Sequence, residues 1–238
     1  MSGHSKWSTI KHKKAALDAK RGKVFTKIIK EISVAARSGG GDPMGNPRLR
    51  FLLEKARAVN MPQDNAQRAI KKGTGELPGQ HYEAHTYEGY GPGGIAVVVD
   101  VLSDNKNRAV GELRHVFSRH HGNLGESGSV SWMFDYVGVL QITGENLSED
   151  FLLERLIEFP IKDIEQEGDT CMIICEPRSL EAVKQVVVDL GLHVKEADLE
   201  WIPKNYVPLN ADQTAKATDF LNALEELEDV QNVYSNIE

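Results

Sequence analysis

The apolar residues in the first third of the chain recur at the spacing of amphipathic helices. Three stripes can be traced: Val24, Phe25, Ile28, Ile29, Ile32 and Ala35; Leu49, Leu52, Leu53, Ala56 and Val59; and Ala66 with Ile70. The run Gly39–Pro43 stops the first helix, and Asn46 with Pro47 begins the second. Pro62 begins the third helix, which Gly73 is expected to end. The pattern predicts a small helical bundle.

The segment Ser8–Arg21 precedes these stripes and has a different character. It carries several lysines and few large apolar side chains. We expect an exposed basic helix or arm, which brings the N-terminal domain of residues 1–75 to three or four helices.

Beyond the linker Gly73–Gly79, strand-like runs alternate with helix-like ones. A first series has a strand at Ile95–Leu102, a helix near 105–121 and a strand near 130–134. A second series has strands near 137–143, 162–167, 170–176 and 193–202, with helices near 147–159 and 179–190. The tail adds a helix near 212–228 and a strand near 230–237.

The second series has the order β-α-β-β-α-β, which is that of a ferredoxin-like domain. The tail supplies the helix and strand that the first series lacks. The sequence therefore predicts a multidomain α+β protein, in which an N-terminal helix bundle is followed by two ferredoxin-like α/β domains. One is split between residues 80–134 and 205–238, and the other, residues 135–204, is inserted in it.

Charge is divided unevenly between these domains. The net charge is −7, yet residues 1–80 contain 17 Lys and Arg against 6 Asp and Glu, a net +11, whereas the remainder contains 11 against 29, a net −18. This segregation indicates that the N-terminal domain approaches a polyanion. We predict that it binds nucleic acid.

The predicted phosphate contacts are the basic side chains of the N-terminal domain, with two rings available for stacking. The first set is Lys6, Lys11, Lys13, Lys14, Lys20, Arg21, Lys23 and Lys27, with Trp7 and His12 as the rings. The second set is Arg48, Arg50, Lys55, Arg57, Arg68, Lys71 and Lys72. Trp7 has an equal alternative as a core anchor, and the sequence leaves open whether the two sets share one face.

Several longer motifs stand in the order and spacing of the YebC family, which the chain resembles over nearly its whole length. They include Gly3–Trp7, Asp18–Lys23, Gly39–Pro43, Asn46–Arg50, Ala69–Gly73, Tyr87–Gly94, Ser103–Asn105 with Asn107–Arg108, Gly122–Gly125 and Leu227–Tyr234. The resemblance implies a helical bundle and two α/β domains. It also implies one of two functions, since bacterial members are named probable transcriptional regulators, while mitochondrial relatives are translational activators and some members relieve ribosome stalling at proline-rich stretches.

The glycine-rich stretch Gly89–Gly94 does not have the spacing of a nucleotide-binding loop, and a strand follows it instead of a helix. We expect a turn between strands that is exposed as a docking loop. The residues assigned to it and to the neighbouring turn are Tyr87, Gly89, Tyr90, Gly91, Pro92, Gly93, Gly94, Asp104, Asn105 and Arg108.

No pattern for catalysis is found. Cys171 and Cys175 share one face of a predicted strand without a second ligand pair, so they are expected in the core. The pair His120–His121 lacks zinc-protease spacing, and Gly125–Gly128 is not a nucleophile elbow. We expect no metal, cofactor, small-molecule substrate or membrane partner, and a cytoplasmic location.

These observations predict a non-enzymatic regulator of gene expression. The favoured reading is a ribosome-associated translation factor that binds ribosomal RNA, with ribosomal proteins as further partners for its acidic part. The alternative is a DNA-binding transcriptional regulator, which would use the same lysines. A hydrolytic enzyme with a spatially assembled site is a distant third.

Overall fold

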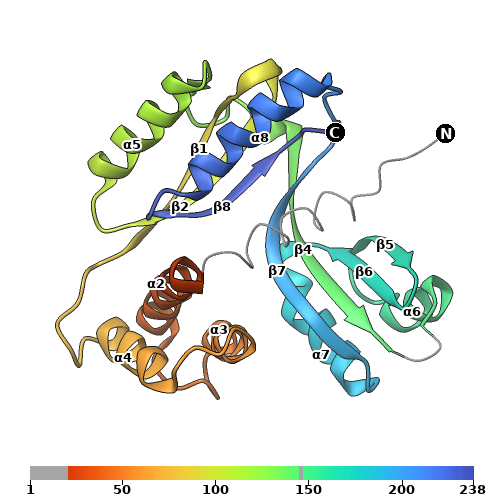
Figure 1. Cartoon of the computed structure of the whole chain (residues 1–238). Helices are drawn as coiled ribbons and strands as arrows, with labels where there is room; N and C mark the ends of the chain where they lie inside the picture. Colours follow the sequence, from red (N-terminus) through yellow and green to blue (C-terminus); the bar gives the residue numbers. More distant parts are fainter. Residues whose placement is uncertain (1–20, 145–146) are drawn as a thin grey trace. The chain divides into compact units, whose positions relative to one another are not determined.

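The computed structural model describes residues 21–144 and 147–238 (Figure 1). Nearly all of the predicted basic arm, Ser8–Arg21, therefore lies outside the described residues. The described chain divides into two compact units. One comprises Met133–Lys204, and the other comprises residues 21–132 together with Asn205–Glu238.

The N-terminal bundle consists of α2 (Arg21–Gly39), α3 (Pro47–Ala58) and α4 (Gln63–Thr74). The three predicted stripes are confirmed, because Ile28, Ile32, Leu49, Leu52 and Ala66 belong to one buried cluster. Asn46 caps α3 by accepting the N–H of Leu49, and its side-chain amide donates to the carbonyls of Ala35 and Gly40. One buried asparagine thus starts α3 and fixes it to the end of α2.

The sequence predicted that the third helix stops at Gly73, and this is wrong. It continues to Thr74, and Gly75 terminates it with a left-handed φ of 84°. Gly73 instead lies where α4 crosses α2. A Cβ atom added there would lie 2.4 Å from the carbonyl oxygen of Ser33 and 2.8 Å from the Cβ of Ala36. This glycine permits close helix packing, which a local stop signal cannot reveal.

The first sheet has the strand order β3-β1-β2-β8, and all its neighbouring strands are antiparallel. Its strands are β1 (Glu83–Tyr90), β2 (Ala96–Ser103), β3 (Asn123–Leu124) and β8 (Val230–Ser235), with α5 (Lys106–Arg119) and α8 (Ala211–Glu225). Both helices pack on the same face, where Leu113 and Phe117 meet Phe220, Val97 and Val99. The tail does complete the sheet that the first series begins.

Two predictions for this sheet were wrong. Tyr87–Tyr90 were expected in a loop but belong to β1, and only a 3₁₀ turn (Pro92–Gly94) connects β1 to β2. The predicted strand near 130–134 is a 3₁₀ turn at Ser131–Met133, and the strand that follows α5 is the two-residue β3. Glu83, His85, Thr86 and Glu88 make half of β1 polar and fall on both of its faces, so it lacks the apolar alternation by which strands are predicted.

The second sheet belongs to the Met133–Lys204 unit. It contains β4 (Phe134–Thr143), β5 (Ile161–Glu167), β6 (Thr170–Cys175) and β7 (His193–Pro203), with α6 (Glu149–Leu156), a 3₁₀ turn (Pro177–Ser179) and α7 (Leu180–Asp189). The predicted β-α-β-β-α-β order is confirmed, and the antiparallel strand order is β5-β6-β4-β7. Cys171 and Cys175 are fully buried core residues, as predicted, and burial raises the pKa of the Cys175 thiol to about 11.

The two sheets have corresponding strand orders, although the chain passes through them differently. In the first sheet, β1 lies between β3 and β2. Strand β6 has the same position in the second sheet, between β5 and β4. In the chain, however, β1 precedes the β2-α5-β3 unit, whereas β6 follows the β4-α6-β5 unit. None of the helices in the described part of the chain is long and apolar enough to cross a membrane.

The packing at Gly73 leads to a stability prediction. Gly73→Ala should lower the free energy of unfolding by about 1 kcal/mol or more, because a contact with the Ser33 backbone outweighs the better helix propensity of alanine. Gly111→Ala is the matched control, since Gly111 is exposed within α5 and an added Cβ would meet nothing within 4 Å. It should raise stability by about 0.5–1 kcal/mol. If both variants were equally stabilised in urea unfolding, the close packing of α4 on α2 at Gly73 would be contradicted.

Candidate nucleic-acid interface

The predicted nucleic-acid contacts fall into three groups in the structure. Lys6, Trp7, Lys11, His12, Lys13, Lys14 and Lys20 lie outside the described residues, as does the side chain of Arg21. The second group, on α3 and α4, is mostly exposed. The third group consists of lysines on α2, which make contacts within the protein.

On α4, Arg68, Lys71 and Lys72 are exposed and occupy the face opposite Ala66 and Ala69, which lie in the core. Their spacing of three and four residues places the three charges together. Among the described residues, none of the three forms an ion pair. These features leave the α4 charges available to a polyanion.

On α3, Arg48 and Lys55 lie seven residues apart on one flank of the buried stripe. Arg50 and Arg57 have the same spacing on the other flank. All except the half-buried Lys55 are exposed. Residues 21–75 carry 12 Lys and Arg against 4 Asp and Glu. The bundle therefore has a positive field over the described residues alone.

Helix α2 has a second contact face opposite its apolar stripe. It is formed by Lys23, Lys27 and Lys30 at spacings of four and three. The Lys23 ammonium donates to the carbonyl of Glu226 over 3.0 Å, and that of Lys27 donates to the carbonyl of Gln231 over 3.0 Å. Lys23 and Lys27 were predicted to contact phosphates. In the structure they bind the backbone around the start of β8.

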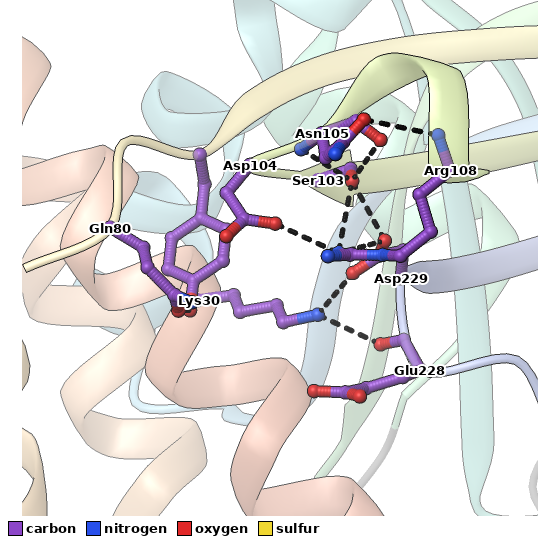
Figure 2. Close-up of polar contacts among 9 residues, drawn as sticks. Lys30, Gln80, Ser103, Asp104, Asn105, Arg108, Glu228 and Asp229 are labelled. Carbon is purple, nitrogen blue, oxygen red and sulfur yellow. Dashed lines mark hydrogen bonds and ion pairs between the residues drawn. The ribbon is translucent and has the colours of Figure 1, made fainter.

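Lys30 forms the buried centre of this contact (Figure 2). Its ammonium lies 2.8 Å from Oδ1 of Asp229 and donates to the carbonyl of Glu228 over 2.9 Å. Both charged side chains are only 3% exposed. A buried charge that loses its partner costs several kcal/mol, so each of these residues requires the other.

The other carboxylate oxygen of Asp229 binds the α/β part of the same unit. Oδ2 accepts 2.7 Å hydrogen bonds from the Ser103 hydroxyl and from the Arg108 guanidinium, which also pairs with Asp104 at 2.8 Å. Asn105 caps α5 by accepting the N–H of Arg108. Figure 2 shows these groups converging on the carboxylate from β2, α5 and α2. Asp229 thus joins three elements through one side chain.

Two groups of this network, Asp229 and Arg108, have pKa values shifted in favour of their ionised forms. Burial alone would raise the pKa of Asp229, but hydrogen bonds from Lys30, Arg108 and Ser103 lower it below its ordinary value. Hydrogen bonds donated by the Arg108 guanidinium to Asp229 and Asp104 raise the pKa of Arg108. The carboxylate therefore stays charged at neutral pH.

Tyr82 covers one side of the network. Its ring centre lies 5.4 Å from the Lys30 ammonium, a distance suited to a cation–π contact, and its hydroxyl donates to Gln80 over 2.6 Å. Burial, together with the carboxylates of Asp104, Glu228 and Asp229, raises the pKa of Tyr82. The aromatic ring further shields the buried pair from water.

Sequence reasoning assigned no role to Lys30, Ser103 or Asp229. The helical spacing of Lys23, Lys27 and Lys30 was a usable signal, because it places three lysines on the face that the bundle core does not need. The partner could not be inferred in the same way, since 199 residues separate Lys30 from Asp229.

The predicted docking residues divide between packing and exposure. Tyr87 packs against the core and Gly89 is buried, whereas Tyr90 is 37% exposed. Gly93 and Gly94 have left-handed φ angles of 75° and 79° in the turn. Asp104, Asn105 and Arg108 all make the structural contacts described above. The exposed part of the predicted set in this region is therefore centred on Tyr90 and the glycine turn.

The loop beside Tyr90 is fixed by the buried carboxylate of Glu88. It accepts hydrogen bonds from the backbone N–H groups of Gly128, Val130 and Ser131 at 2.7–2.8 Å. Burial would raise the pKa of Glu88, but these N–H groups lower it. Ser129 lies between the bonded residues Gly128 and Val130, so its carbonyl is held in place.

Two exposed aromatic side chains use that carbonyl. The Tyr90 hydroxyl donates to Ser129 over 3.2 Å, and the indole N–H of Trp132 donates to the same oxygen over 3.1 Å. Trp132 is 66% exposed. Their polar atoms are thus bonded while large ring surfaces remain open to solvent. Among the described residues, no group of three potential metal ligands comes together.

We predict that Asp229→Asn lowers the free energy of unfolding by about 3 kcal/mol or more at pH 7, because Lys30 remains buried without an anion. The folded-state pKa of Asp229 is depressed, so its contribution is complete above the unfolded value of about 3.9 and is lost as pH falls through the folded pKa.

The difference from wild type should accordingly shrink below about pH 4. Asp169→Asn, at an exposed turn residue, is the control and should change stability by less than about 0.5 kcal/mol. Chemical denaturation at several pH values measures both effects. A loss at pH 7 no larger than that of the control would contradict the role of the pair.

The chain matches two family profiles that together cover nearly its whole length. Residues 5–76 match the TACO1/YebC protein N-terminal domain, and residues 82–237 match the TACO1/YebC second and third domain. A protein of Desulfosudis oleivorans named "Probable transcriptional regulatory protein" is 53% identical over 236 residues, covering 99% of this chain and 96% of the relative. A Chlorobium luteolum protein of the same name is 52% identical over 239 residues, covering 100% and 96%.

A solved structure has the same fold. A conserved hypothetical protein from Aquifex aeolicus superimposes with a TM-score of 0.84 at 46% sequence identity, covering 98% of this chain and 97% of that one. Fold, sequence and both domain profiles agree. The chain therefore belongs to the TACO1/YebC family.

Proposed function

We propose that this protein is a non-enzymatic, cytoplasmic regulator of gene expression that binds nucleic acid through its helical bundle. The observation that carries the proposal is the exposed basic surface of α3 and α4. Lys23, Lys27 and Lys30 are used for internal contacts, whereas Arg68, Lys71 and Lys72 face solvent. The names of the bacterial relatives agree with a regulatory role.

We further propose that the target is RNA on the ribosome and that the protein assists translation through proline-rich stretches. The exposed rings of Tyr90 and Trp132 support RNA over duplex DNA, because unpaired bases stack on aromatic side chains and paired bases do not. The Tyr90 edge, with Gly91–Gly94, would be the docking edge. The acidic remainder of the chain suits contacts with basic ribosomal proteins.

One observation favours the alternative, a DNA-binding transcriptional regulator. Helices α3 and α4 are connected by only Val59–Pro62, and Asn60 in that turn has a left-handed φ of 58°. A turn of this length joins the helices of helix-turn-helix proteins, where the second helix enters the major groove. Helix α4, with Arg68, Lys71 and Lys72, would then be the recognition helix.

Charge reversal on α4 tests the binding surface. Arg68→Glu, Lys71→Glu and Lys72→Glu together should weaken nucleic-acid binding at least tenfold. They should also make the log-log salt slope shallower by about 2, since each phosphate contact contributes about 0.7 on single strands. The thermal midpoint should barely change because the side chains are exposed.

The matched control reverses three exposed basic residues outside the bundle, Lys106, Lys162 and Arg178. It produces the same net charge in a different place. An equal loss of affinity in the control would mean that overall charge governs binding, and that α4 is not the contact surface.

A reconstituted translation system distinguishes RNA from DNA as the target. Messenger RNA is supplied directly, so transcription cannot contribute. The wild-type protein should increase full-length product from a template with consecutive proline codons, and the α4 variant should not. A template without proline runs is the control. No effect of wild-type protein on any stalling template would reject the ribosomal function and favour binding of duplex DNA, which electrophoretic mobility shifts would then measure.

A further inference from the structure

A hollow of about 460 Å³ lies on the α/β part of the unit formed by residues 21–132 and Asn205–Glu238. It is bordered by the glycine turn after β1, by the end of α5 and by the first half of α8. Gly93, Arg119, His121 and Lys216 contribute to its lining. Its volume lies within the range of pockets that bind small ligands, roughly 300–1,000 Å³.

The charge of the hollow is opposite to that of its surroundings. Residues 81–238 carry 11 Lys and Arg against 29 Asp and Glu, yet Arg119, Lys216, His120 and His121 line the hollow with only one carboxylate, that of Asp219. Neither Arg119 nor Lys216 forms an ion pair within the described part of the chain. Such a concentration of unpaired donors in an acidic region favours an anionic ligand.

The walls of the hollow are fixed by the core beneath them. The His120 ring lies 5.8 Å from the ring of Phe220, which is fully buried and packs edge-on against Phe117 at 4.9 Å. His121 follows with a left-handed φ of 60°, which is uncommon for a residue other than glycine. This conformation turns the chain sharply after α5 and fixes the backbone of His121.

The glycine turn also contributes to the lining, through Pro92 and Gly93. Gly93 has a left-handed φ of 75°, and a Cβ atom added there would lie 2.8 Å from the Leu209 side chain, which packs against the turn. The turn is closed by hydrogen bonds from Gly91 N–H to the Ile95 carbonyl at 2.8 Å and from Gly94 N–H to the Gly91 carbonyl at 3.1 Å. A rigid turn and two cations in one lining are suited to a compact anion.

We propose that this hollow binds the phosphate group of a nucleotide. Arg119 and Lys216 bind the phosphate oxygens, the imidazoles of His120 and His121 supply further hydrogen bonds, and the Asp219 carboxylate accepts from a ribose hydroxyl. A free mononucleotide and a single nucleotide of an RNA strand offer the same chemistry. The site lies outside the helical bundle, so it goes beyond the nucleic-acid surface proposed above.

The test uses the full-length protein, labelled with ¹⁵N and titrated separately with AMP and with a single-stranded RNA nonamer. Saturable shifts are expected in the amide signals of Gly93, His121 and Gln213, which line the hollow. Arg119→Ala with Lys216→Ala should weaken the response at least tenfold. Lys106→Ala with Arg114→Ala is the matched control, since it removes the same charge from exposed positions on α5 outside the lining.

Shifts at the hollow with AMP would identify a free nucleotide as sufficient, and shifts with the nonamer alone would identify a strand; either supports the site. No saturable shift with either probe, or an equal loss in the control variant, would overturn it. The α4 charge-reversal variant should keep the AMP response, so failure of the bundle as a nucleic-acid surface can be told apart from failure of the hollow.

Discussion

The buried ion pair between Lys30 and Asp229 is the contact on which the organisation of the larger unit depends. An ammonium and a carboxylate that are each 3% exposed cannot separate without leaving an unsolvated charge. The carboxylate also holds Ser103 and Arg108, and the carbonyl of Asp229 accepts the N–H of Leu102. One residue immediately before β8 therefore joins the helical bundle to the first sheet, and the two belong to a single unit.

This arrangement determines which basic residues remain for a ligand. Helix α2 has two occupied faces, an apolar one toward α3 and α4 and a lysine face toward the segment around β8. Its lysines stabilise the protein internally, and a lysine that binds a carbonyl offers less to a phosphate. On the outer surface of α4, Arg68, Lys71 and Lys72 form no ion pair among the described residues. The internal contacts and the proposed nucleic-acid surface thus involve different residues of one basic domain.

The insertion of Met133–Lys204 into the first α/β domain has a simple structural basis. Its first and last strands, β4 and β7, are neighbours, and Phe134 pairs with Pro203 at their outer end. The N–H of Lys204 donates to the carbonyl of Met133 over 2.9 Å. Because the two ends of the insert meet, the host chain is interrupted at only one point. The pairing of β4 with β7 offsets the entropic cost of bringing these ends together.

The sequence by itself determined the elements whose signals are local. The three apolar stripes, the Asn46 cap, the β-α-β-β-α-β order of the insert and the burial of Cys171 with Cys175 all follow from period, capping chemistry and hydrophobicity. Strand β1 was missed because polar residues occupy half of its positions and fall on both faces. The two residues of β3 are too few to form a pattern.

Only the tertiary structure decided which charges are used inside the protein and which face outward. Lys30 and Arg68 look alike in the sequence, since each lies on a basic helix, yet one is buried against Asp229 and the other is exposed. The difference arises from a partner 199 residues away. Helical periodicity can place a lysine on a face, but what covers that face is fixed by long-range packing.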